Sequence, residues 1–381
     1  MNRPALIMAG GTGGHVFPAL ALARMLREQS IEVVWLGTRR GLEARIVPAE
    51  PLPIEWLTVG GLRGKGFATL LAAPFRVGAA LVQACRVMWR HRPFVVVGLG
   101  GFVTGPGGIA AWITRRPLVI HEQNAIAGFT NRVLAHFARD VLEAFPGSFG
   151  PGVRARTIGN PVRREITSTA FPAERFTARS GPLRILVVGG SQGAVRLNTV
   201  VPLALAAVGQ RLPIEVRHQA GSRWQEAAES SYAGAGVPAQ VMPFIEDMAA
   251  AYAWADLVIC RAGALTISEL AAAGVGAILV PFPAAVDDHQ TANARYLVNA
   301  GAAVLIAERE LTAERLAAEI EKLTAGASSD SGRAEPGRTH HEPRPARERL
   351  LGMAERARSL ALPRAAEELA AACRKYAEVG S

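Results

Sequence analysis

The feature that most constrains the fold is a pattern of strand, glycine-rich turn and helix that occurs twice in the chain. The first copy has the apolar run Ala5-Leu6-Ile7-Met8, a turn over 10–15 and an apolar helix predicted over 16–26. The second has the run Ile185-Leu186-Val187-Val188, a turn over 189–194 and a helix predicted through Leu205. Such a turn presents backbone N–H groups and the positive end of a helix dipole to an anion. The duplication therefore predicts two similar anion-binding halves.

Continuous apolar runs follow each opening and alternate with helical segments, as is typical of buried parallel strands in a doubly wound sheet. The predicted strands are 31–36, 94–98, 118–121 and 141–144 in the first half, and 214–218, 257–260, 277–281 and 304–307 in the second. We therefore predict an α/β protein with two Rossmann-like parallel-sheet domains facing a cleft. Ligands bind at the carboxyl ends of the strands of such sheets.

Composition shifts along the chain predict the limits of the two domains. Glycine and proline in Gly159-Asn160-Pro161-Val162-Arg163 indicate a boundary, so we expect domains over 1–163 and 164–363. Residues 325–347 are rich in Ser, Gly, Pro and Arg and lose apolar periodicity, which predicts a mobile surface insertion. Helical periodicity returns at 350–362 and 364–376.

The net positive charge of the chain comes from its first half. Residues 1–163 carry 19 Lys and Arg against 8 Asp and Glu, whereas 164–381 carry 23 against 24. No acidic residue lies between Glu55 and Glu122, and arginines alternate there with large apolar residues. This predicts a basic and apolar surface within 62–92 and 112–116 that binds anionic lipid headgroups, with an ordinary core helix and a solvated Arg face as the alternative. Without a recognition motif, we expect no nucleic-acid partner.

Several classes of site and location are disfavoured. The three cysteines are far apart and outside metal-ligand spacing, which predicts no disulfide framework, no zinc site and a reducing cytoplasm. The N-terminal apolar run is too short for a signal peptide, and Pro74 and Arg76 interrupt the longest one, so we expect no transmembrane helix. The chain has no Asp-x-Asp triplet to hold a metal on a nucleotide diphosphate, so we expect neither metal nor cofactor. Val16 replaces the third glycine of a dinucleotide fingerprint, which disfavours an NADP enzyme.

Polar groups at the predicted strand ends are candidates for chemistry. His15 at a helix start favours a neutral ring that accepts a proton, or else it caps or packs. His121-Glu122-Gln123-Asn124 ends a strand on the expected cleft side. Thr266 and Glu269 have the spacing of a capping box, which is one interpretation of this segment. In the other interpretation, the helix start binds phosphate and Glu269 accepts hydrogen bonds from a ribose diol. A polar group follows another strand and either binds sugar hydroxyls or forms a capped loop: Asp287-Asp288-His289-Gln290 and Asn293.

Taken together, six motifs resemble the MurG family, bacterial N-acetylglucosaminyltransferases that make lipid II for peptidoglycan. They are 10–18, Gly100-Gly101-Phe102, His121-Glu122-Gln123-Asn124, 159–163, 189–194 and Gly263-Ala264-Leu265-Thr266. The resemblance spans nearly the whole chain and implies a GT-B fold, UDP-N-acetylglucosamine as donor and undecaprenyl-pyrophosphoryl-MurNAc-pentapeptide (lipid I) as acceptor. It also implies a peripheral place on the cytoplasmic face of the inner membrane and a cell-wall synthesis complex as partner. A UDP-N-acetylglucosamine epimerase, another sugar-nucleotide enzyme or a non-catalytic binding protein are the alternatives.

The resemblance implies a role for individual residues. The C-terminal half would hold the donor: its diphosphate by Ser191 and the helix start Ala264-Leu265-Thr266, its uridine by Arg163 and the backbone of Ile245, and its ribose by Glu269. Thr12, Gly13, Gly14, Asn124 and Gln290 would lie at the sugar or the reacting centre, with the first turn facing the acceptor pyrophosphate. The final helix, about 364–381, would cross back to the N-terminal domain.

The same resemblance implies an inverting reaction, because an α-linked donor sugar ends in a β bond through one displacement. A base must then deprotonate the acceptor hydroxyl opposite the leaving UDP. We expect His15 to be that base, with Glu122 as the alternative. The chain departs from the family at Phe102, where Tyr is common. The loop before Gln290 is one residue longer, which leaves the choice between Gln290 and His289 open.

Overall fold

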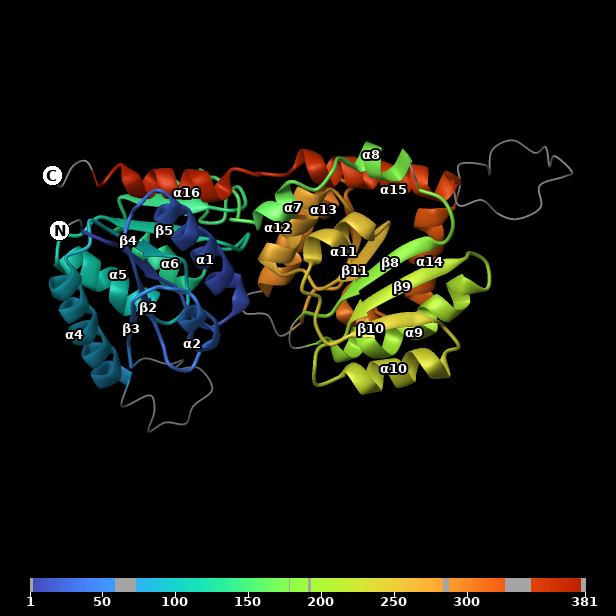
Figure 1. The fold of residues 1–381 in the computed structure, drawn as a ribbon, viewed down its shortest axis with the longest axis horizontal. Helices are drawn as coiled ribbons and strands as arrows, with labels where there is room; N and C mark the ends of the chain where they lie inside the picture. Colours follow the sequence, from blue (N-terminus) through green and yellow to red (C-terminus); the bar gives the residue numbers. More distant parts are fainter. Residues whose placement is uncertain are drawn as a thin grey trace, which may run out of the picture. The chain divides into compact units, whose positions relative to one another are not determined.

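The computed structural model describes residues 3–58, 73–177, 179–190, 193–283, 288–325 and 344–377. The chain forms two compact units. Unit 1 comprises Met1–Val162 and Leu362–Ser381, and unit 2 comprises Arg163–Ala361. Each unit is a parallel sheet covered by helices (Figure 1). No helix within the described ranges is long and apolar enough to cross a membrane.

Unit 1 contains a seven-stranded parallel sheet in the order β3-β2-β1-β4-β5-β6-β7. Its strands are β1 (Ala5–Met8), β2 (Val33–Gly37), β3 (Ile54–Trp56), β4 (Val95–Gly98), β5 (Leu118–Glu122), β6 (Asp140–Glu143) and β7 (Arg156–Thr157). The strand order reverses between β1 and β4, so the connections that follow these two strands diverge to opposite faces of the sheet. That switch point is where open α/β sheets bind ligands.

Side chains that alternate along β1 hold the helices on the two faces of this sheet. Ala5 and Ile7 pack with α1 (Gly13–Glu28) and α16 (Ala365–Arg374), whereas Leu6 and Met8 pack with α4 (Ala73–His91) and α5 (Thr104–Ile113). Helices α16 and α1 lie side by side (Figure 1). Three short elements complete unit 1: α2 (Glu43–Ile46), η1 (Val47–Ala49) and α6 (Phe129–Leu134).

Unit 2 repeats this topology with six parallel strands in the order β10-β9-β8-β11-β12-β13, and its switch point lies between β8 and β11. Its strands are β8 (Leu183–Val188), β9 (Ile214–Gln219), β10 (Ala239–Met242), β11 (Leu257–Cys260), β12 (Gly276–Leu279) and β13 (Ala303–Leu305). Its helices are α7 (Arg164–Thr167), α8 (Pro172–Thr177), α9 (Val195–Gly209), α10 (Gln225–Gly234), α11 (Met248–Trp254), α12 (Ala264–Ala273), α13 (His289–Asn299), η3 (Glu308–Glu310), α14 (Ala313–Thr324) and α15 (Arg344–Ser359). The prediction of two Rossmann-like sheets is confirmed, and each predicted strand is present with its ends displaced by at most two residues.

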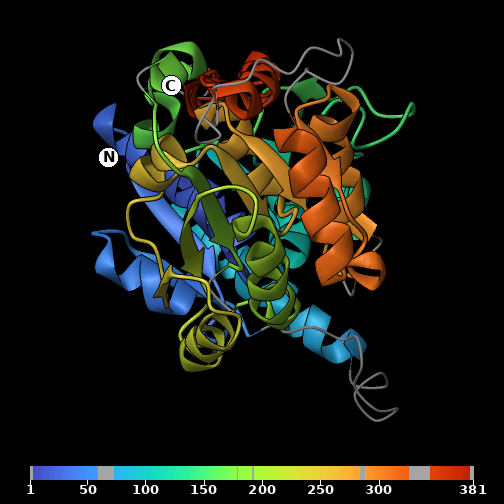
Figure 2. The ribbon, with the colours of Figure 1, turned by 90° about the vertical axis from the view of Figure 1, so that its right-hand side faces the viewer.

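The core of unit 2 joins β8 to α9 and α14. Ile185 and Val187 of β8 are fully buried together with Leu205 of α9 and Ile320 of α14. Helices α9 and α14 lie next to each other in Figure 2, where they are olive green and orange. Apolar burial therefore fixes the strand that carries the second glycine-rich turn.

A buried ionic cluster ties α15 to the sheet of unit 2. Asp256, which is fully buried, pairs with Arg179 and with Arg347, whose guanidinium lies 3.3 Å from Asp256 Oδ2. Arg347 is only 6% exposed and α15 begins at residue 344, so the prediction that a mobile insertion extends to 347 is wrong at its last four residues. The rest of that predicted insertion, 326–343, lies outside the described residues.

Candidate active site

The connection after β1 packs against the connection after β4 at the switch point of unit 1. Gly101 has a φ of +85°, and a Cβ at this position would collide with the carbonyl oxygen of Gly10. Only glycine avoids both the strained backbone and the collision. The first glycine-rich turn therefore rests directly on the backbone of the second connection.

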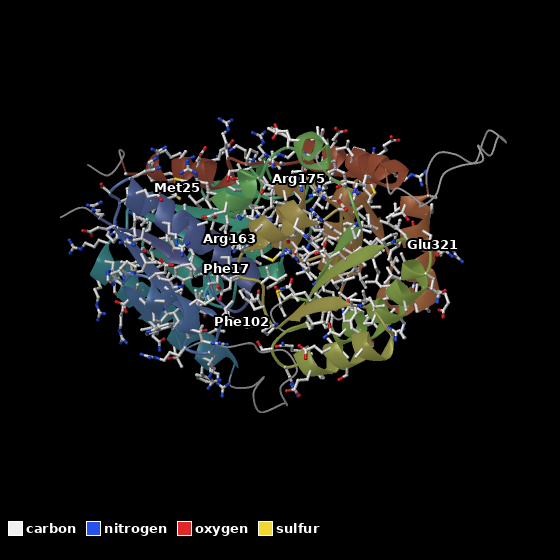
Figure 3. All side chains as sticks on the ribbon, turned by 45° about the vertical axis from the view of Figure 1, so that its right-hand side comes forward. Phe17, Met25, Phe102, Arg163, Arg175 and Glu321 are labelled. Atoms are coloured by element: carbon white, nitrogen blue, oxygen red, sulfur yellow. The ribbon has the colours of Figure 1, made fainter. Side chains whose placement is uncertain are left out.

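Helix α1 begins directly after this turn, with Thr12 as its N-cap residue. The N–H groups of Thr12, Gly13 and Gly14 make no hydrogen bond with any residue that the structure describes. Three N–H groups at the positive end of a sixteen-residue helix can bind an anion such as a pyrophosphate. Phe17 and Phe102, both exposed, flank the turn from α1 and from the connection after β4 (Figure 3).

A buried carboxylate that sequence reasoning missed holds this turn. Glu43 of α2 is fully buried and accepts hydrogen bonds from the N–H of Gly11 at 2.8 Å, and from the N–H and Oγ1 of Thr38 at 2.9 and 2.7 Å. A Cβ at Gly37 or Gly41 would collide with its side chain. The sequence signal that could have found it is the pair of glycines shortly before it in the chain.

His15 lies in the first turn of α1, close to these free N–H groups. Its Nδ1 lies 2.9 Å from Oε1 of Gln123, and its ring lies against the backbone of Gly100, where a Cβ would come within 2.5 Å of Nδ1. The side chain is half-buried. Two neighbouring connections therefore fix the orientation of the ring.

Gln123 and His121 continue the hydrogen bonds into the protein. The Gln123 Nε2 group donates to the His121 carbonyl oxygen at 3.0 Å and lies 3.1 Å from His121 Nδ1, and His121 Nε2 lies 2.9 Å from the Gly159 carbonyl oxygen. Desolvation by burial lowers the pKa of His121 to about 4, against smaller opposing effects of the Gly159 hydrogen bond and the Glu122 charge. His121 is therefore neutral at pH 7.

Glu122 organises the loop that follows β5. It is 2% exposed, and its Oε1 accepts from the N–H and Nδ2 of Asn124 at 3.0 and 3.1 Å. Its Oε2 accepts from the N–H of Gly128 at 3.1 Å and from Asn131 Nδ2 at 2.8 Å. Donors of this loop and of α6 engage both oxygens, so this carboxylate holds Asn124 in place.

In unit 2, the second glycine-rich turn follows β8 as the first follows β1. Ser191, predicted to bind the donor diphosphate, lies outside the described residues. On either side of it, Gly190 and Gly193 have φ values of +81° and +75°, and a Cβ at Gly193 would collide with the Ala220 carbonyl oxygen. Tight backbone packing thus requires glycine in this turn as well.

Helix α12 starts at the switch point of unit 2, after β11. Its N-cap residue is Gly263, and no side chain caps the helix. The capping-box interpretation of Thr266 and Glu269 is therefore wrong, because the helix begins at Ala264 and both residues lie inside it. The first-turn residues Ala264-Leu265-Thr266 supply N–H groups at the end where an anion would bind.

Glu269 is held by a cation and a phenol. Its Oε1 lies 3.5 Å from an Arg163 guanidinium nitrogen, and its Oε2 accepts a hydrogen bond from the Tyr252 hydroxyl at 3.1 Å. Burial raises the pKa of Glu269, and the neighbouring Arg163 and Tyr252 oppose that rise. The Glu269 side chain is 16% exposed and that of Arg163 is 46% exposed, so both remain accessible to a ligand.

Gln290 joins the ends of β11 and β12. Its Oε1 accepts from the N–H of Ala262 at 3.2 Å and from the N–H of Phe282 at 2.9 Å, which places its side chain beside the start of α12. The backbone of Ile245 is partly occupied, because its N–H donates to Gln219 Oε1 at 3.1 Å.

Within the described residues, no cluster of three His, Cys, Asp or Glu could hold a metal ion, and metal independence stays a prediction.

Two Rossmann-like units, each with a glycine-rich turn at its switch point, define a two-domain glycosyltransferase of the GT-B type. The glycosyltransferase family 28 N-terminal domain matches residues 5–143, and the family 28 C-terminal domain matches residues 184–342.

Similar proteins identify the family of the chain within this class of glycosyltransferases. It is 58% identical to the UDP-N-acetylglucosamine–N-acetylmuramyl-(pentapeptide) pyrophosphoryl-undecaprenol N-acetylglucosamine transferase of Nitrosococcus oceani, over 88% of this chain and 94% of that protein. It is 55% identical to the protein of the same name from Alkalilimnicola ehrlichii, over 98% of this chain and 99% of that one. The crystal structure of Acinetobacter baumannii MurG superposes with a TM-score of 0.83 at 40% identity, covering 98% of this chain and 99% of that chain. The chain belongs to this family of N-acetylglucosamine transferases.

Proposed function

We propose that this protein transfers N-acetylglucosamine from UDP-N-acetylglucosamine to the 4-hydroxyl of MurNAc in lipid I, which gives lipid II and UDP. The observation that carries the proposal is His15, an oriented imidazole in the same turn as three N–H groups that have no partner among the described residues. Two further observations support it: relatives of the chain bear the name of this transferase, and a glycine-rich turn lies at the switch point of each unit.

We assign the donor to unit 2. The two oxygens of Glu269 can accept from the ribose diol, and Arg163 beside it can contact the uridine. The carbonyl of Ile245 remains for the uracil edge, since its N–H is taken by Gln219. Ser191 and the start of α12 would hold the diphosphate.

We assign the acceptor to unit 1. The N–H groups of Thr12, Gly13 and Gly14 would bind the pyrophosphate of lipid I, and Asn124 would contact the sugar at the reacting centre. Gly11 takes no part in this, because its N–H already donates to Glu43.

The chemistry is a single in-line displacement that inverts the sugar. His15 Nε2 takes the proton of the acceptor 4-hydroxyl while that oxygen bonds to C1 of N-acetylglucosamine and the bond from C1 to UDP breaks. We prefer His15 to Glu122 as the base because four hydrogen-bond donors already engage the Glu122 oxygens. Helix N-termini and backbone N–H groups would stabilise the charge on the leaving UDP.

We also propose peripheral attachment to the cytoplasmic face of the inner membrane through α4 and the end of α5. Phe75, Val82 and Trp89 are exposed and recur every seven residues, so they share a face of α4 with Arg86. Helix α5, which packs on α4, ends with Trp112 exposed. The predicted part of this surface at 62–72 lies outside the described residues.

Turnover assays test the transferase. Purified protein should release UDP from UDP-N-acetylglucosamine only when a lipid I analogue is present, whereas isomerisation without acceptor would indicate the epimerase. His15→Gln should lower kcat by about 10²-fold or more with unchanged UDP affinity, because the donor binds unit 2. The matched control is His136→Gln at an exposed histidine of unit 1. Turnover like that of the wild type in His15→Gln would remove His15 from the role.

Co-sedimentation with vesicles tests the membrane surface. Binding should increase with the anionic lipid content and fall in Arg86→Glu. Arg211→Glu, an exposed charge reversal in unit 2, serves as the control and should bind like the wild type. Binding that ignores both the lipid charge and Arg86→Glu would contradict the proposal.

A further inference from the structure

A row of hydrogen bonds runs from His15 through Gln123 and His121 to the carbonyl of Gly159, entirely within unit 1. His121 and Gln123 are 0% and 1% exposed, so the contacts of His121 with Gln123 and with Gly159 are shielded from solvent. The row has a direction because each member must donate to or accept from the next. That direction determines which nitrogen of His15 carries a proton.

The carbonyl of Gly159 fixes the first member. A carbonyl oxygen can only accept, so the contact of 2.9 Å requires a proton on His121 Nε2. Since His121 is a neutral ring in this buried place, its Nδ1 carries a lone pair and accepts from Gln123. The histidine nitrogen that a protein protonates is set in this way by the partner of the other nitrogen.

The Gln123 amide cannot be turned around. Its nitrogen donates to the His121 carbonyl oxygen at 3.0 Å and faces the lone pair of His121 Nδ1 at 3.1 Å. A flipped amide would place an oxygen against two acceptors. The Oε1 atom must therefore point to His15, and it can only accept, so His15 Nδ1 donates.

We propose that Gln123 is a positioning residue that holds His15 in its Nδ1–H form, with the lone pair on Nε2, and that His121 fixes the orientation of Gln123. This inference rests on the proposed function, in which Nε2 takes the acceptor proton. Nε2 makes no hydrogen bond with the part of the chain that the structure describes, which leaves it available to substrate. The backbone of Gly100 against the ring opposes a rotation that would exchange the two nitrogens.

The tautomer is measured directly by ¹⁵N NMR of histidine-labelled protein at pH 8, above the ordinary histidine pKa of about 6.5. His15→Gln assigns the signal. Without substrate, wild-type His15 should show a protonated Nδ1 and an unprotonated Nε2. Gln123→Leu should shift the signal toward the Nε2–H form, and Gln29→Leu, at the other end of α1, should leave it unchanged. A wild-type His15 in the Nε2–H form would overturn the proposal, and this holds even if Gln123→Leu does not fold.

Kinetics provide the second readout. Gln123→Leu should lower kcat at least tenfold while KM for UDP-N-acetylglucosamine changes less than twofold, because the donor site lies in unit 2. An unchanged His15 signal in folded Gln123→Leu would overturn the positioning role. If the signal shifts but neither Gln123→Leu nor His15→Gln loses turnover, the tautomer assignment stands and the proposed base role fails.

Discussion

Replacing Glu43 by glutamine tests whether a buried carboxylate holds the first turn. Glu43 accepts three hydrogen bonds, two at Oε1 from Thr38 and one at Oε2 from Gly11. Glutamine can keep its oxygen toward Thr38, but its NH2 group then faces the N–H of Gly11. A hydrogen bond to a charged group contributes about 1.5–3 kcal/mol, and the two remaining bonds lose their charge assistance. We expect a loss of about 2–4 kcal/mol in the free energy of unfolding of unit 1.

The assay is thermal and urea unfolding combined with steady-state kinetics. A loss of this size lowers Tm by roughly 4–16 °C in a unit of this length. The Kd for UDP should stay unchanged and KM for a lipid I analogue should rise, because only the turn of unit 1 is loosened. Glu50→Gln is the control, since Glu50 pairs with an exposed Arg24 and such pairs contribute about 0–1 kcal/mol. The reasoning would be refuted if Glu43→Gln and Glu50→Gln were equally stable. It would also be refuted if Glu43→Gln lost affinity for UDP as much as for the lipid I analogue.

Three further outcomes follow from buried groups. Acidification from about pH 6.5 to about pH 4 should lower the free energy of unfolding, by about 3 kcal/mol for His121 alone. The reason is that His121 and His218 have pKa values of about 4 and about 3 in the folded protein, so they bind protons more readily in the unfolded chain. A free energy of unfolding that stays constant over this range in urea titrations would contradict this. Asp256→Ala should lower the free energy of unfolding by about 3–5 kcal/mol because it leaves the buried Arg347 without its carboxylate partner. An unchanged Tm would show that the ion pair does not stabilise the protein. Gly101→Ala should lower both Tm and turnover, and normal values of both would mean that the two connections of unit 1 need not touch.

The sequence predicted the strands that have continuous apolar runs and missed three edge strands that have none. Strands β3, β7 and β10 were not predicted, because they are short and their residues are half-buried or exposed, without a continuous apolar run. The two switch points followed from the glycine-rich turns, whose backbone requirements are local. Long apolar runs thus identified the inner strands of each sheet and the edge strand β13, and failed at the other three edge strands.

The site residues were predictable as members of motifs, but their roles depended on contacts across the fold. The sequence made Glu122 a candidate base but could not show its four donors, one of them on Asn131 nine residues away. Glu43 reaches Gly11 over 32 positions, and no local pattern indicates such a contact. The spacing of Thr266 and Glu269 fitted a capping box by coincidence, since only the backbone shows where a helix begins.

The placement of α16 has a consequence for how the protein is made. Leu369, Ala370, Ala372 and Cys373 of this helix are buried in a core cluster of unit 1, whose other buried members come from the first 158 residues. During synthesis, the part of α1 that packs against α16 therefore stays uncovered until residues 365–374 have been made, which is after all of unit 2 has been synthesised. The nascent unit 1 should therefore depend on chaperones until α16 has left the ribosome.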